Sequence, residues 1–86
     1  MVMTEESAWI LAWFESRGSV PGGTPEEKLT VNYFNAGLVD SMSVIELIAA
    51  VEERFGIRFG DTHFQEPRFA TIGGLCEIVQ KLVASS

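Results

Sequence analysis

Apolar residues recur at intervals of three and four along three stretches of the chain, which is the spacing that places them on one face of a helix. The expected helices cover about 5–17, 41–55 and 71–84. A shorter helix over about 61–65 and a long loop over 18–37, which proline and glycine punctuate, connect them. The pattern therefore predicts an all-α fold, a small four-helix bundle with three main helices, one short helix and a long first loop.

The ends of these helices carry recognisable signals. Thr4 and Thr71 supply capping oxygens, and Gly18 and Gly56 suit helix ends. A structureless loop of this length is unusual in a compact domain, so apolar residues should pin it, and the segment 25–28 can form a single helical turn. The predicted core of the helices comprises Trp9, Trp13, Val44, Leu47, Ile48, Val51, Phe55, Ile72, Leu75, Cys76, Val79 and Leu82. The residues expected to pin the loop are Leu29, Val31, Tyr33 and Phe34, and Ile57 and Phe59 should anchor an extended connector after the second main helix.

Composition narrows the class of protein. The 86 residues suffice for one domain, and a hydrophobic fraction of 47% indicates a folded globule. The net charge of −6 would repel phosphate backbones and anionic lipid surfaces, so we expect no nucleic acid and no stable membrane insertion. The start of the chain resembles no signal peptide and no apolar run reaches membrane-spanning length, which predicts a cytoplasmic protein, and we expect a monomer.

Two residues with reactive side chains carry little functional signal. Cys76 is the single cysteine and lies within a helical pattern, so it is expected to be a small buried hydrophobe. His63 has no second histidine or cysteine at ligand spacing. No metal site is predicted.

Ser41 is the candidate for chemistry, because it stands where the long loop meets the second main helix. Asp40 beside it can cap that helix by accepting the amide of Met42 or Ser43. No histidine, lysine or second carboxylate is positioned in sequence to activate the hydroxyl. We therefore predict no catalytic residue, and interpret Ser41 as a handle that another enzyme modifies.

The segment Gly37-Leu38-Val39-Asp40-Ser41-Met42, with Val44-Ile45-Glu46-Leu47 and Glu52-Glu53-Arg54-Phe55-Gly56-Ile57 behind it, resembles the carrier proteins that bear 4′-phosphopantetheine. These are acyl, peptidyl and D-alanyl carriers, and the similarity covers about Tyr33 to Leu82. Two residues separate Gly37 from Asp40, where many fatty-acid carriers have one. This spacing is closest to D-alanyl-type and stand-alone acyl or aminoacyl carriers, as is the stretch ending in Phe69-Ala70-Thr71.

The resemblance implies that Ser41 carries covalent 4′-phosphopantetheine, donated from coenzyme A by a phosphopantetheinyl transferase that brings Mg²⁺. Asp40 would be the acidic recognition residue as well as the cap. An acyl- or aminoacyl-activating ligase would load a thioester, and a downstream acyl transferase or condensing enzyme would receive it in lipid or natural-product biosynthesis. Partner enzymes would meet Met42, Ile45, Glu46, Ala49, Glu52 and Glu53, with the acids steering basic docking patches.

Two other functions stay open at this point. An acidic helical module that binds partners but is never modified would show the same pattern. A small enzyme would need a base and a pocket, and the sequence indicates neither. Within the carrier class, the departures from the fatty-acid pattern favour aminoacyl or specialised acyl cargo over routine fatty-acid synthesis.

Overall fold

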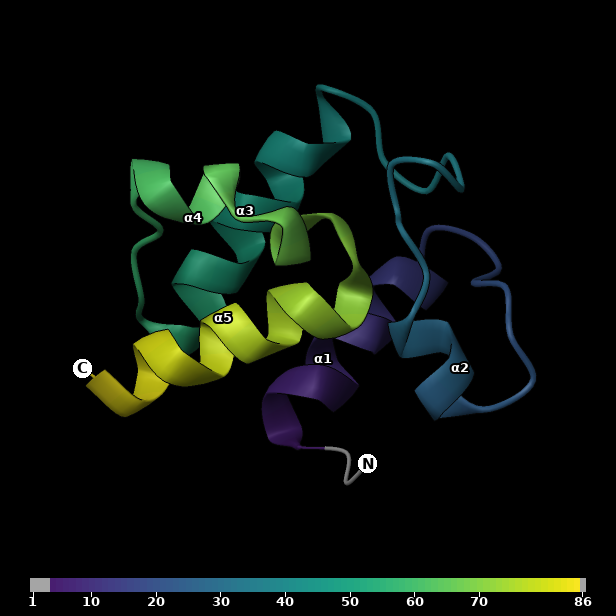
Figure 1. The fold of residues 1–86 in the computed structure, drawn as a ribbon, viewed down its shortest axis with the longest axis horizontal. Helices are drawn as coiled ribbons and strands as arrows, with labels where there is room; N and C mark the ends of the chain where they lie inside the picture. The colour runs from purple at the N-terminus through teal and green to yellow at the C-terminus, as the bar shows by residue number, and fades with distance from the viewer. Residues whose placement is uncertain (1–3, 86) are drawn as a thin grey trace.

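A computed structural model describes residues 4–85 of the chain. This part consists of helices joined by loops, with one isolated bridge between Asn32 and Thr71 as its only β-type pairing (Figure 1). The all-α prediction is confirmed. The elements are α1 (Glu5–Glu15), α2 (Pro25–Leu29), α3 (Ser43–Phe55), α4 (Asp61–Gln65), the 3₁₀ helix η1 (Pro67–Ala70) and α5 (Ile72–Ser85).

The helical turn expected over 25–28 is confirmed as α2, whereas η1 was not expected. The loop over 18–37 is interrupted by α2, which Thr24 caps by accepting the Glu27 amide at 3.2 Å. Pro67 opens η1, because proline lacks the donor that a first helical turn leaves unpaired anyway. The main helices also differ at their ends, since α1 stops at Glu15 and α3 begins at Ser43.

The caps expected at Thr4, Thr71 and Gly56 are present, whereas Gly18 does not end α1, because Ser16 already stands at its C-cap. The Thr4 hydroxyl accepts the Ser7 amide at 3.1 Å, and the Thr71 hydroxyl accepts the Gly74 amide at 3.0 Å. Gly56 ends α3 with a φ of +66°, a left-handed conformation that glycine adopts without steric cost.

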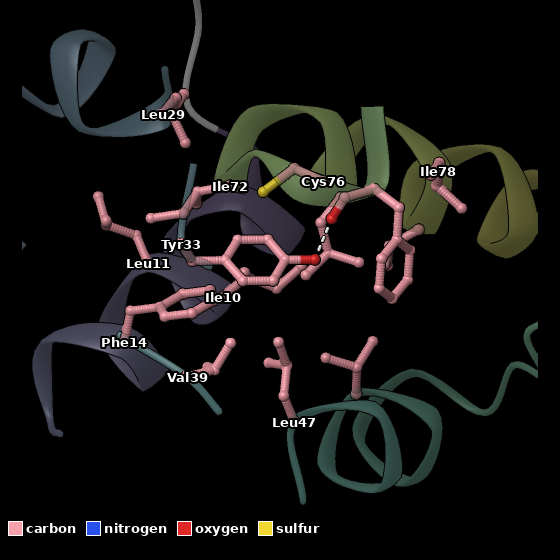
Figure 2. Packing of buried hydrophobic residues seen from close by; sticks show 14 of the residues in the cluster. Ile10, Leu11, Phe14, Leu29, Tyr33, Val39, Leu47, Ile72, Cys76 and Ile78 are labelled. Carbon is pink, nitrogen blue, oxygen red and sulfur yellow. Dashed lines mark hydrogen bonds between the residues drawn. The ribbon is translucent and has the colours of Figure 1, made fainter. Parts of the chain in front are cut away.

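The core lies between α5, α1 and α3, with Tyr33 of the first loop at its centre (Figure 2). Phe34 is a correction, because it was expected to pin the first loop and is instead exposed. Several predicted core residues, among them Trp9, Trp13 and Phe55, are only partly buried at its edge. The buried hydrophobic residues are Ile10, Leu11, Phe14, Val20, Leu29, Tyr33, Val39, Leu47, Val51, Ile57, Phe69, Ile72, Leu75, Cys76, Ile78 and Val79.

Close backbone packing explains the two glycines that weaken the first turn of α5. A Cβ on Gly74 would lie 1.9 Å from the Arg68 carbonyl oxygen, and one on Gly73 would lie 2.9 Å from the Leu29 carbonyl oxygen. Each glycine lowers helix propensity by about 1 kcal/mol, but only glycine at these two positions lets α5 pack this closely against α2 and η1.

Candidate functional site

Ser41 is exposed at the junction between the first loop and α3. In Figure 1 the loop climbs past α2 to the start of α3 at the top of the view. Oδ1 of Asp40 accepts the amides of Met42 at 3.0 Å and Ser43 at 2.8 Å, which confirms the predicted cap. Hydrogen bonds from Ser43, and then from the Met42 amide, lower the pKa of Asp40. A carboxylate and a hydroxyl are thus presented side by side at a helix start.

The chain before this junction is held by Tyr33. Its amide donates to the Ala70 carbonyl at 3.1 Å, and its buried hydroxyl donates to the Phe69 carbonyl (Figure 2). Burial raises the pKa of the Tyr33 hydroxyl, so it remains a donor at neutral pH. The Leu38 amide then returns to the Tyr33 carbonyl at 2.9 Å, and the side chain of Val39 is buried. The backbone is therefore anchored up to the residue before Asp40.

The first turns of α3 present apolar side chains to solvent. Met42 is 73% exposed and Ile45 is 63% exposed. The other large exposed hydrophobics of the described residues are Phe34 at 43% and Phe64 at 44%. These two line an open apolar hollow of about 290 Å³ on the flank of α3, together with Val44, Ile48, Glu66, Pro67, Phe69 and Ala70.

The acidic residues of α3 have intramolecular partners. Glu46 forms an ion pair with Arg17 at 2.9 Å. Glu52 accepts the Phe59 amide at 2.9 Å and so holds the connector that follows α3. Glu53 is exposed, as are Ala49 and the two apolar residues of the first turns. The residues expected at a partner surface thus lie on α3 or at its start, and two of the three acids, Glu46 and Glu52, also contact other segments of the chain.

Cys76 and His63 occupy structural positions. Burial raises the pKa of the Cys76 thiol to about 11, so the thiol is protonated at neutral pH. Nδ1 of His63 accepts the Gly60 amide at 2.8 Å at the start of α4. Over residues 4–85 no three histidine, cysteine or acidic side chains gather where they could hold a metal ion.

The family model for the phosphopantetheine attachment site matches residues 20–79 of the chain. The chain therefore belongs to this family, and it is a phosphopantetheine-dependent carrier protein whose cofactor is covalently attached 4′-phosphopantetheine. Neither the curated proteins nor the solved structures gave a match. Within residues 4–85 no helix is both long enough and apolar enough to cross a membrane.

The chemistry at the start of α3 fits this cofactor. A phosphate ester needs a hydroxyl that a transferase can reach, and Ser41 is exposed there. The positive end of the α3 dipole favours the added negative charge. The amides of Met42 and Ser43 are already bonded to Asp40, so the dipole and solvent, rather than these two amides, would accommodate the phosphate.

Sequence reasoning placed Ser41 and Asp40 at a helix start and named Tyr33 among the residues that should pin the loop. It did not give the hydrogen bonds by which Tyr33 does so. The ion pair between Arg17 and Glu46 joins segments that are distant in sequence, so no local pattern signals it. Phe34 and Phe64 have no periodic signal that marks them as exposed, since their positions depend on how the loop and α4 fold back.

Proposed function

We propose that Ser41 is the attachment residue and that the chain carries an acyl or aminoacyl group as a thioester between partner enzymes. The observation that carries the proposal is an exposed serine at the start of α3, inside the segment that the family model covers. The bound group supplies a flexible arm with a terminal thiol. The arm raises the local concentration of cargo at each partner, which is tethering rather than catalysis.

The attachment step assigns simple roles to the residues of the chain. Ser41 Oγ attacks the β-phosphorus of coenzyme A, the new O–P bond forms, and adenosine 3′,5′-bisphosphate leaves. The proton of Ser41 passes to a base of the transferase, whose Mg²⁺ offsets charge on the pyrophosphate. Asp40 fixes the start of α3 and presents its exposed carboxylate to the transferase. Because no base of this chain acts in the step, we propose a carrier that is substrate and not enzyme.

The cargo we favour is an aminoacyl or a specialised acyl group. The two residues between Gly37 and Asp40 support this, as they are typical of D-alanyl-type and stand-alone carriers. The apolar hollow beside α3 is small and open at about 290 Å³, which lies at the low end of ligand-binding pockets and favours a small group over a long chain.

Intact mass tests the attachment. The purified chain is incubated with coenzyme A, Mg²⁺ and a broad-specificity phosphopantetheinyl transferase. We expect one phosphopantetheine adduct on the wild type and on the matched control Ser43→Ala, and none on Ser41→Ala. An unmodified wild type, or an adduct that persists in Ser41→Ala, would overturn the proposal and favour an interaction module that is never modified.

Thiol titration gives an independent readout of the same reaction. Cys76 is the single cysteine of the chain and is buried, so the folded apo form should react slowly with a thiol reagent at neutral pH. The modified form gains one accessible thiol at the end of the arm. Equal rapid labelling of both forms would contradict the expected attachment.

A further inference from the structure

An ion pair joins Arg17, two residues after α1, to the first turn of α3, on the surface where partners are proposed to dock. Arg17 Nη1 lies 2.9 Å from Glu46 Oε2. The guanidinium also lies over the Trp13 ring, 4.2 Å from its centroid. Two contacts therefore hold this cation beside Glu46, one turn along α3 from the exposed Met42.

The other acids of α3 add little charge near Ser41. Glu52 keeps its charge while it accepts the Phe59 amide, but it lies nine residues beyond Ser43, which is about 14 Å along the helix axis. Glu53 lies ten residues beyond Ser43, which is about 15 Å along the helix axis. Both separations exceed the Debye length of about 8 Å at physiological ionic strength. Asp40 is thus the principal negative charge that a partner meets beside the serine.

Resting on the proposed function, we infer that Arg17 determines which partners recognise this carrier. It cancels the charge of Glu46 and leaves an apolar contact centred on Met42 and Ile45. The matching partner surface is apolar, with a single cation opposite Asp40. A strongly basic surface is disfavoured, because the Arg17 guanidinium stays partly exposed and would face it.

The ion pair can be removed without disturbing the fold. Both side chains are substantially exposed, and exposed pairs contribute little to stability. Lys28 offers a matched control, since it pairs at 2.8 Å with Glu15 of α1 and not with an acid of α3. Arg17→Gln and Lys28→Gln each remove one cation from an ion pair, so they change net charge equally.

The test compares the rate of phosphopantetheine transfer to Ser41 among variants that remove one or both charges of the ion pair. The kcat/KM of the transferase is measured by intact mass in about 0.05 M and about 0.5 M NaCl, which differ about threefold in Debye length. Arg17→Gln should raise kcat/KM about two- to fivefold in low salt and not in high salt, because Glu46 is then bare. The double variant Arg17→Gln/Glu46→Gln should have a kcat/KM within about 1.5-fold of wild type. Lys28→Gln should also have a kcat/KM within about 1.5-fold of wild type at both salt concentrations.

Three results would overturn the inference while Ser41 is still modified, so the proposed function would stand. One is an Arg17→Gln effect that does not depend on salt. Another is a double variant that is clearly slower than wild type, which would mean that Glu46 contacts the partner directly. The third is a Lys28→Gln effect as large as that of Arg17→Gln, which would reflect net charge only. If the wild type takes no adduct, the proposed function fails and the inference fails with it.

Discussion

The loop before Ser41 and the helix after it are neighbours in sequence but opposite in character. From Val31 to Val39 the chain is tied to η1 and α5, with Tyr33 buried at the centre of the core. From Met42 to Ile45 it turns large apolar side chains to solvent. The residues at the site are exposed but not mobile for that reason, because the buried side chains of Tyr33 and Val39 hold the backbone that precedes them.

This division has a physical advantage for a protein that must meet several enzymes in turn. A surface that is already ordered loses less conformational entropy when a partner binds it. The anchored loop fixes where α3 begins, and Leu47 and Val51 fix α3 on the core. The exposed face between these anchors can then be contacted and released without refolding.

The largest expected effect comes from a substitution on the exposed face of α3. Ile45→Asp should lower the kcat/KM of phosphopantetheine transfer about tenfold or more, because it places a charge at the centre of the apolar contact. The helix should be retained, since an acid in a first turn is favourable. Transfer is followed by intact mass and folding by circular dichroism. Ala84→Asp, which adds the same charge near the exposed end of α5, is the control and should transfer at the wild-type rate.

A smaller effect, on stability, is expected from a substitution in the anchored loop before Ser41. Tyr33→Phe removes the hydroxyl that donates to the buried Phe69 carbonyl, at an expected cost of about 1–3 kcal/mol in the free energy of unfolding. Thermal unfolding should show a lower Tm, and hydrogen exchange should be faster at the Leu38 and Val39 amides. Phe34→Leu changes an exposed ring on the same loop and should alter stability by no more than about 0.5 kcal/mol. Equal Tm values for Tyr33→Phe and wild type would mean that the hydroxyl does not anchor the loop.

The smallest effect concerns Asp40, where the two regions meet. Its pKa is lowered in the folded chain, so its ionised cap stabilises the fold above the ordinary aspartate pKa of about 3.9. The contribution is lost as pH falls through the lower folded pKa. Wild type should therefore be more stable than Asp40→Ala at neutral pH, with a Tm difference that narrows in acid.

Asp40→Asn removes the negative charge of the side chain but keeps an oxygen that can cap α3, so it separates these two roles of Asp40. The amide oxygen can still accept the Met42 and Ser43 amides, so the Tm at neutral pH should stay near wild type. A slower transferase reaction with Asp40→Asn at unchanged Tm would assign the carboxylate a role in recognition. Identical kinetics would leave Asp40 with the cap alone.

Predictions from sequence succeeded where the signal was local. The apolar period of 44–55 located α3, and Thr4, Asp40 and Thr71 cap where their side chains suggested. They failed for Phe34, because a loop has no period that tells a buried ring from an exposed one. The acidic face of α3 was read as free for partners, whereas Glu46 and Glu52 each contact a residue of another segment.

The sequence by itself determined the helical class, the main helices, their caps and a serine placed at a helix start, since each of these depends on residues within one or two turns of one another. Tertiary structure alone decided that Tyr33 reaches the Phe69 carbonyl, that Arg17 neutralises Glu46 and that an apolar hollow opens beside α3. These contacts join segments that are distant in the chain, and only the packing of the helices against one another brings such segments within bonding range.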